Sequence, residues 1–280
     1  MNLKEIWRFL RDLMAAIGKD QIGLISAGIA FYGLLSLFPG IAAIMALGGL
    51  LTAPIALVAQ MQQVGSLMPP EAAKIILDQA TEIAGSAKGG LGVTAAVGIG
   101  LSIYSASNAV GALIIGIHVA AGEVDDRGMV RRFLFTLVMT VVAVPLALLA
   151  LFSTVVLPAV LAALHVGTVG VWLAGLVRWP IIGAIAACGL GLFYRLSIRH
   201  RLPRPRWITP GAILSIVLWV VGSILFSIFV QNFAHYNQTF GTLGGLVSLL
   251  MWMWLSAYIV LLGEEVNTLI VAQDGPAAVT

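Results

Sequence analysis

"GAILSIVLWVVGSILFSIFVQ", residues 211–231, is a run of 21 residues without a single charged side chain. "LVSLLMWMWLSAYIVLLG", residues 246–263, follows shortly afterwards and is also free of charge. Continuous apolar stretches of about 18 or more residues are typical of transmembrane helices, because about 20 helical residues cross the hydrocarbon core of a bilayer. These two runs indicate an integral membrane protein.

The composition of the whole chain supports this interpretation. Of the 280 residues, 60% are hydrophobic and only 10% are charged, whereas about 25% of residues in a soluble domain are charged. The mean hydropathy is +1.03. The lone cysteine, Cys188, lies in an apolar run and excludes an intramolecular disulfide.

Apolar segments recur along the chain, and we expect six transmembrane helices. They lie near residues 21–52, 91–121, 132–163, 174–196, 210–234 and 243–270. The expected fold class is therefore an all-α polytopic membrane bundle, with one transmembrane domain over residues 21–270 and a cytoplasmic tail over 271–280.

Two further segments have an amphipathic helical pattern. In residues 3–17 apolar side chains recur at helical spacing while charged ones occupy the other face, so residues 1–20 are expected to form an interfacial helix. Residues 69–88 begin with two prolines and a glutamate, which is typical of a helix start. This second helix is expected outside the membrane, within an external segment at 53–90.

The distribution of Lys and Arg predicts the orientation. Twelve of the 15 basic residues lie in the N-terminal arm, the second-to-third connection and the fourth-to-fifth connection, which share one side of the membrane. The other side has only Lys74, Lys88 and Arg178. Because Lys and Arg concentrate in cytoplasmic flanks, both termini are expected in the cytoplasm.

Polar side chains inside the apolar segments are candidates for substrate binding, because an amide or carboxylate in hydrocarbon needs a partner. The candidates are Tyr32, Tyr104, Ser107, Asn108, Glu265 and Asn267. We expect Ser26, Tyr32 and Ser36 to be able to bind the amide of Asn108. Glu264 and Glu265 point about 100° apart on a helix, so at most one should face the bundle centre. Pairing of one glutamate with an arginine of the 195–206 loop is the alternative to a polar gate.

A dense basic cluster precedes the fifth apolar segment. Its members are Arg195, Arg199, Arg201, Arg204 and Arg206. Such a cluster can hold anionic lipid headgroups, or it can serve the orientation of the chain alone.

The uncharged, glycine-rich stretch at 232–245 is expected to be a mainly structural hairpin between the last two spans. Its candidate residues are Tyr236, Asn237, Thr239 and Gly241. They would satisfy free backbone groups at the helix ends. The alternative is a polar lining at the mouth of a cavity.

Four stretches carry a resemblance to a known family. They are "SAGIAFYGLLSLFPG" (26–40), "SASNAVGALIIGIHVAAGEVDDRG" (105–128), "RWITPGAILSIVLWVVGSILFSIFV" (206–230) and "YNQTFGTLGGLVSLLMWMWLSAYIVLLGEEVN" (236–267). Over residues 20–270 the chain resembles the YihY/BrkB family of bacterial inner-membrane proteins, formerly labelled ribonuclease BN. The resemblance implies six helices and a role in the cell envelope, linked in some members to serum resistance or lipopolysaccharide-precursor export. Glu264 departs from the small residue usual there.

The sequence does not favour an enzyme. The four histidines have no metal-ligand spacing, and Glu123, Asp125 and Asp126 are followed at once by arginines, which is typical of a solvated, self-neutralising loop. We therefore expect no catalytic residue, metal or cofactor, and no nucleic-acid partner. The predicted function is handling or transport of a lipid or another amphiphilic envelope component. Membrane lipids are the expected partners; homo-oligomerisation and a protein partner stay open. The alternatives are a small-solute or ion transporter and a membrane scaffold.

Overall fold

The computed structural model describes residues 3–48, 58–59, 61–62, 70–86, 91–142, 168–198, 209–232 and 242–273. All regular secondary structure in these ranges is helical, which confirms the predicted all-α class. The helices are α1 (Leu3–Lys19), α2 (Ile22–Gly48), α4 (Pro70–Ser86), α5 (Leu91–Ala120), α7 (Thr168–Ser197), α8 (Pro210–Asn232) and α10 (Thr242–Gln273). Residues 129–142 are also helical.

Three helical segments of the described residues are long and apolar enough to cross a membrane: Ile103–Ala120, Pro210–Val230 and Gly244–Gln273. A fourth is obtained if α1 and α2, which meet at an angle of 56°, are counted as one broken span. Within the described part of α7, the apolar segment Gly183–Ser197 is shorter. Most of the predicted 132–163 span lies outside the described residues, so the number six stays a prediction.

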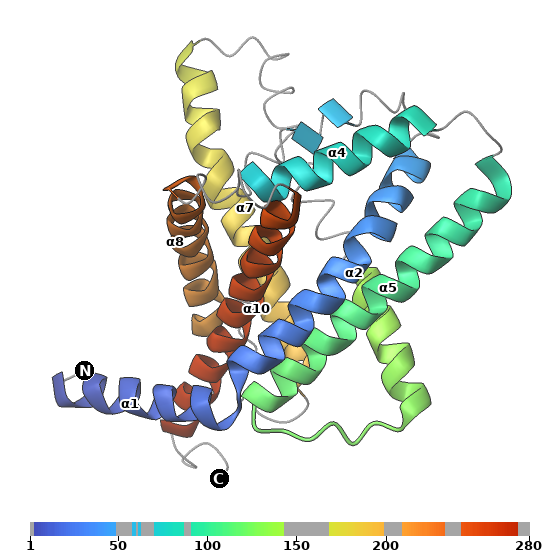
Figure 1. The fold of residues 1–280 in the computed structure, drawn as a ribbon. Helices are drawn as coiled ribbons and strands as arrows, with labels where there is room; N and C mark the ends of the chain where they lie inside the picture. The colour runs from blue at the N-terminus through green and yellow to red at the C-terminus, as the bar shows by residue number, and fades with distance from the viewer. Residues whose placement is uncertain are drawn as a thin grey trace.

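Helix α10 runs through the middle of the bundle (Figure 1) and contacts α1, α2, α4, α5 and α8. Helices α2 and α5 pack along each other, and α7 packs against α8. The main core forms where these helices meet. Its fully buried members are Ile22, Ile117, Ala120, Tyr194, Ala212 and Leu261.

Helices α1 and α4 lie across opposite ends of the bundle (Figure 1). Both helices expected at 3–17 and 69–88 are therefore present, although their position on a membrane surface stays a prediction. Gln21 adopts a left-handed φ of 49°, which ends α1 and allows α2 to start in a new direction. Buried Ile41 and Ala80 join α4 to the far end of α2.

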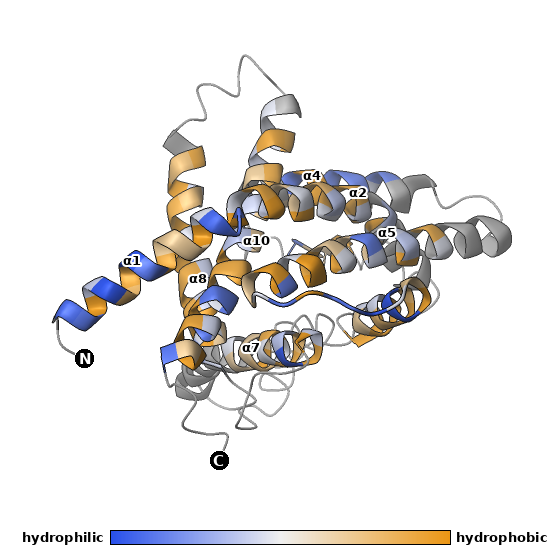
Figure 2. Ribbon diagram, turned by 90° about the horizontal axis from the view of Figure 1, so that it is seen from below, coloured by the Kyte–Doolittle hydropathy of each residue, from blue (hydrophilic) through white to orange (hydrophobic). Residues whose placement is uncertain are grey.

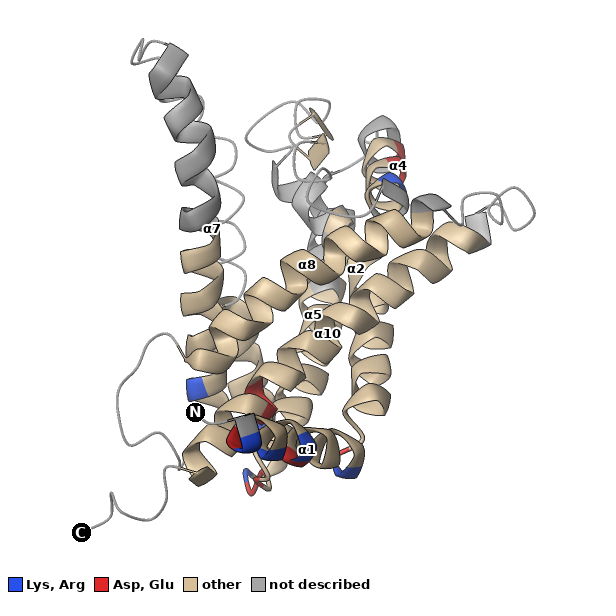
Figure 3. Cartoon of the chain, turned by 90° about the vertical axis from the view of Figure 1, so that its left-hand side faces the viewer, with Lys and Arg blue, Asp and Glu red and all other residues tan. Residues whose placement is uncertain are grey.

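Large apolar side chains remain exposed along the bundle. The ribbon of α8 is largely orange in Figure 2, the colour of hydrophobic residues. On α8 the exposed large apolar side chains are Ile213, Val217, Val220, Val221, Ile224, Leu225, Ile228 and Phe229. Exposure of this extent is costly in water but not in lipid. Figure 3 shows that charged residues gather at the α1 end, with a smaller group on α4.

Two reciprocal hydrogen bonds tie α8 to α10. The indole N–H of Trp219 donates to Ser256 Oγ at 3.0 Å, and that of Trp252 donates to Ser223 Oγ at 3.2 Å. The two indole rings also contact each other, with centroids 5.9 Å apart. Because neither indole N–H can bond to lipid tails, these pairings fix the register of the two helices.

Candidate functional site

A buried group of polar side chains lies where α7, α8 and α10 meet, toward the α1 end of the bundle. Helix α10 contributes Glu264, Glu265 and Asn267, which are only 4%, 2% and 6% exposed. The other members are Tyr194, Thr209 and Ser215. These six residues are called the polar cluster below. Three adjoining acid and amide groups at such depth are uncommon, because each needs a partner to offset its lost hydration.

Asn267 organises the part of the cluster that joins α10 to the start of α8. Its Oδ1 accepts a hydrogen bond of 2.8 Å from the backbone N–H of Gly211. Its Nδ2 donates to Thr209 Oγ1 at 3.2 Å and to Glu264 Oε2 at 3.0 Å. Thr209 Oγ1 also accepts from the N–H of Ala212. A threonine before a proline at the first helical position is a typical helix start, and Asn267 completes its capping.

Tyr194 joins α7 to the same region. Its hydroxyl donates to the carbonyl of Val260 at 2.5 Å and lies 3.3 Å from Ser215 Oγ. Ser215 in turn donates to the carbonyl of Ile259 at 3.0 Å. Two side chains from two helices therefore bond to consecutive carbonyls of α10, which holds three helices in fixed relation.

Two glycines allow α8 and α10 to approach closely beside the cluster. A Cβ added to Gly211 would overlap the carbonyl oxygen of Gly263, and a Cβ added to Gly263 would overlap Ser215 Oγ. The backbones are thus in contact at this crossing. Small residues at helix contacts of this kind are common in membrane bundles.

Glu265 is the member of the polar cluster that has a side-chain oxygen without a hydrogen-bond partner. Its Oε1 is buried and has no hydrogen-bond partner. The side chain faces the bend between α1 and α2, where it shares a side-chain hydrogen bond with Asp20 and lies within electrostatic reach of Lys19. Buried polar atoms without a partner are rare in native proteins, so this carboxylate is the strongest candidate for contact with a ligand.

Glu264 and Glu265 are both buried, although they point in different directions from α10. The 100° angle between them holds, but α10 is central and has neighbours on several sides. Glu264 points toward Asn267 and the start of α8, while Glu265 points toward the α1–α2 bend.

The other predicted substrate-binding residues are not gathered with the cluster. Tyr32, Tyr104 and Asn108 are exposed on the outside of α2 and α5, whereas Ser107 is buried and its Oγ has no partner. The serines expected to serve Asn108 bond within their own helix. Ser26 donates to the carbonyl of Ile22 and Ser36 to that of Gly33, both at 2.7 Å. Serine in a helix readily forms this local bond, which competes with a partner on another helix.

Of the predicted lipid-headgroup arginines, Arg195 is exposed near the end of α7. The remaining four, at positions 199, 201, 204 and 206, lie outside the described residues. The predicted hairpin residues Tyr236, Asn237, Thr239 and Gly241 also lie outside them.

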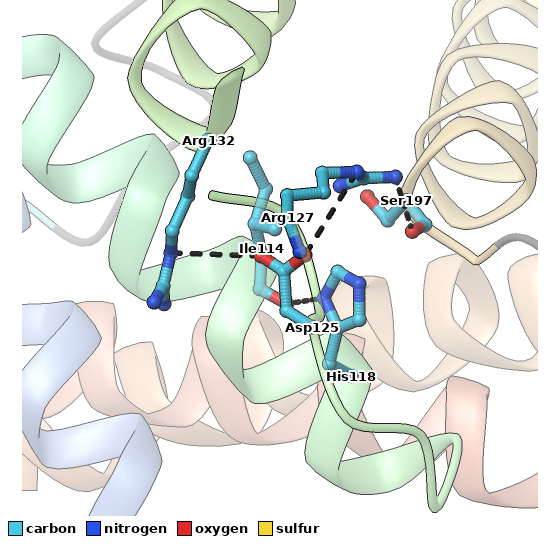
Figure 4. Close-up of polar contacts among 6 residues, drawn as sticks. All are labelled: Ile114, His118, Asp125, Arg127, Arg132 and Ser197. Carbon is cyan, nitrogen blue, oxygen red and sulfur yellow. Dashed lines mark hydrogen bonds and ion pairs between the residues drawn. The ribbon is translucent and has the colours of Figure 1, made fainter. Parts of the chain in front are cut away.

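The acidic and basic loop after α5 is solvated in part, as exposed Asp126 shows. The side chains of Asp125 and Arg127 are only 10% and 8% exposed. Asp125 lies 3.8 Å from Arg127 Nε and 3.5 Å from Arg132 Nε, so the loop is self-neutralising as expected. The side chains of Asp125 and Arg127 are buried because Arg127 reaches across to α7 and donates to the carbonyl of Ser197 at 3.3 Å (Figure 4). His118 is buried beside this loop and bonds to the carbonyl of Ile114.

Sequence reasoning missed Tyr194, Thr209 and Ser215. A signal existed for Thr209, since "TPG" at 209–211 is a typical helix start. Tyr194 and Ser215 gave none, because a tyrosine at the end of an apolar run and a serine within one are common in membrane helices.

Comparison with known proteins gives the same assignment as the four sequence stretches. The family model of the virulence factor BrkB matches residues 13–278. The chain belongs to the BrkB virulence factor family. It is thus a membrane protein, in agreement with its apolar helices.

Two relatives of the BrkB-family chain are informative. A ribonuclease-like protein, YfkH, of Bacillus subtilis (strain 168) is 27% identical over 268 residues, which are 94% of each chain. A UPF0761 membrane protein of Xanthomonas oryzae pv. oryzae (strain PXO99A) is 34% identical over 99 residues, which are 35% of this chain and 23% of the relative. No solved structure matches. Among the described residues of this chain, no group of three His, Cys, Asp or Glu side chains could hold a metal ion.

Proposed function

We propose that this BrkB-family chain is a non-enzymatic protein of the bacterial inner membrane that handles or transports a lipid or another amphiphilic component of the cell envelope. In this proposal the chain spans the membrane six times, both termini lie in the cytoplasm, and the polar cluster contacts the polar head of the ligand. The name of the Bacillus relative refers to a ribonuclease; our proposal for this chain is a binding function.

The observation that carries the proposal is the position of Glu265. Its unpartnered Oε1 is buried beside the α1–α2 bend, and α1 exposes large apolar side chains such as Trp7 and Met14. A buried hydrogen-bond acceptor and exposed apolar side chains thus lie at the same end of the bundle. A ligand with a polar head and an apolar chain suits both features, because each part of the ligand meets a surface of its own polarity.

The chemistry of the cluster favours a headgroup that donates hydrogen bonds. A carboxylate accepts bonds from hydroxyl or ammonium groups. Lys19, at the end of α1, can at the same time attract an anionic part of the head. The proposed ligand is therefore an amphiphile with hydroxyl or amino groups in its head.

The proposal is tested by measuring which amphiphiles co-purify with the full-length protein. The protein is extracted in mild detergent as wild type, as Glu265→Gln and as the control Glu82→Gln, an exposed glutamate on α4 at the opposite end. We expect one lipid class to be enriched over the membrane extract. Its amount should fall by about tenfold in Glu265→Gln, the effect of losing one bond to a charged group, and stay unchanged in Glu82→Gln. Equal lipid content in all three proteins and the membrane would contradict the proposal.

A second function, movement of a cation or small solute, is favoured by one observation. Glu265 lies beside a second carboxylate, Asp20, and paired carboxylates within a membrane protein are typical of ion and proton pathways. Proteoliposomes distinguish the two functions. Cation or proton flux that is lost in Glu265→Gln, without enrichment of any lipid, would favour the transporter.

A further inference from the structure

We propose that Arg127 and Ser197 form a binding site for a phosphate-type anion at the α1 end of the bundle. This inference rests on the proposed function, because it assigns the anionic part of the amphiphile to a second place apart from the polar cluster. The anion is a phosphate group, either in a lipid head or as free phosphate.

The first observation is the bonding of Arg127. Its side chain is 8% exposed, and its Nη2 donates to the carbonyl of Ser197 at the end of α7. Its Nη1 is buried and has no hydrogen-bond partner. Capping of the helix end explains the Nη2 contact, because the last carbonyls of a helix lack internal partners and favour a cation. It does not explain a buried guanidinium nitrogen with two unused N–H groups.

The second observation is independent and concerns Ser197. This residue is fully buried, and its Oγ also has no hydrogen-bond partner. Figure 4 shows the side chain of Ser197 and the guanidinium of Arg127 facing each other. Two buried donors without partners therefore adjoin at one contact, and an acceptor between them would satisfy both. A phosphate offers several acceptor oxygens and matches the forked guanidinium.

One carboxylate lies within ion-pair distance of two arginines at the site. Asp125 is 3.8 Å from Arg127 Nε and 3.5 Å from Arg132 Nε, and its Oδ2, which faces Arg132, has no hydrogen-bond partner. The ring of Phe135 covers a face of the guanidinium: Arg127 Cζ lies 3.8 Å from the centroid of this ring. This stacking holds the arginine in place and leaves the edge of the guanidinium for hydrogen bonding.

The depth of the site fits a lipid head. Ser197 is the last residue of α7 and ends its apolar segment, and the basic stretch 199–206 follows in the sequence. The boundary between an apolar helix and basic residues is the depth at which phosphates of the bilayer lie. Arg127 enters from the loop between α5 and the helix at 129–142, so the site joins two distant parts of the chain.

Binding is measured by native mass spectrometry on the full-length protein in detergent, with three probes. Phosphatidylglycerol carries the lipid phosphate, diacylglycerol carries the same chains without phosphate, and inorganic phosphate carries the anion alone. The variants are Arg127→Gln and Ser197→Ala. Arg131→Gln is the matched control, because Arg131 belongs to the same region but is exposed.

We expect Arg127→Gln to weaken phosphatidylglycerol binding by about tenfold and Ser197→Ala by about threefold or more, as loss of single bonds to an anion would. The affinity for diacylglycerol should be the same in all variants. Arg131→Gln should bind phosphatidylglycerol as tightly as the wild type does. The same pattern with inorganic phosphate alone would support the anion site and identify free phosphate as the ligand. Unchanged affinity for both anionic probes in Arg127→Gln and Ser197→Ala would overturn the proposal.

Two measures keep the outcome clear. If Arg127→Gln does not fold, Ser197→Ala and Arg127→Lys replace it. Ser197→Ala keeps the backbone carbonyl that Arg127 contacts. Arg127→Lys keeps the positive charge but lacks the forked guanidinium. If the amount of co-purified lipid depends on Glu265 but not on Arg127, the proposed function stands and the anion site is overturned. If phosphate binding depends on Arg127 and no lipid is enriched, the anion site stands and the proposed function is overturned.

Discussion

The side-chain oxygen of Asn267, near the end of α10, accepts a 2.8 Å hydrogen bond from the backbone N–H of Gly211 in the first turn of α8. The first N–H groups of a helix have no partner within it. Here a residue 56 positions later in the chain supplies one, and the same amide bonds Thr209 and Glu264. Asn267 thus couples the start of one helix to the buried acid of another.

Replacing Asn267 by Ala should lower the stability of the folded bundle. It leaves the buried N–H of Gly211 and the carboxylate of Glu264 without their partner, at a cost of about 1–3 kcal/mol. Thermal unfolding in detergent measures this, with Gln273→Ala at the exposed end of α10 as control. An unchanged melting temperature in Asn267→Ala would contradict the role of this amide.

Replacing Gly263 by Ala should also destabilise the bundle, for a steric reason. The added Cβ would overlap Ser215 Oγ and approach the carbonyl of Gly211 at 2.7 Å, so α8 and α10 would have to separate. Overpacking of this kind costs about 1–3 kcal/mol. The measurement is again the melting temperature of the purified protein.

Gly28 provides the control for this substitution, because a Cβ there would meet nothing within 4 Å. Gly28→Ala should leave stability unchanged or raise it slightly, since alanine favours a helix over glycine by about 1 kcal/mol. Equal losses in Gly28→Ala and Gly263→Ala would mean that close helix contact is not the cause.

The helical, membrane-spanning character of the chain could be predicted from its sequence because it depends on local composition. A charge-free run such as 211–231 has one stable form in a bilayer, and α8 occupies Pro210–Asn232. The two prolines and the acid at the start of α4 similarly marked a helix that is present. In each case the deciding residues are neighbours in the sequence.

The meeting of polar side chains could not be predicted, because it depends on how distant helices are rotated. Asn108 and Asn267 are both amides in apolar segments, yet the first is exposed and the second is buried. The sequence pattern around the two residues gave no reason to expect one to be exposed and the other to be buried. The burial of Arg127 was missed for the same reason, since only the position of the α7 end explains it.

The indole–serine pairs between α8 and α10 give a third prediction. Trp252→Phe removes the N–H that bonds Ser223 but keeps an aromatic ring against Trp219. The expected loss is about 0.5–1.5 kcal/mol, one hydrogen bond with little loss of packing. Ser223→Ala should give a similar loss, and the double variant should lose little more than either single one. Fully additive losses would show that the two groups do not act through one bond.

The orientation of the chain gives the last prediction. Helix α4 and the loop after α5 lie at opposite ends of the bundle (Figure 1), so a reagent that cannot cross the membrane should reach only one of them. In a Cys188→Ala background, we expect an impermeant maleimide to label Asp78→Cys in spheroplasts and to label Arg131→Cys only after permeabilisation. Both positions are exposed, so folding alone does not protect either. The expectation follows from the charges, because most Lys and Arg of the described residues lie at the α1 end and such ends face the cytoplasm. Labelling of Arg131→Cys alone would invert the topology, and labelling of both positions in intact spheroplasts would mean that the bundle does not separate them across the membrane.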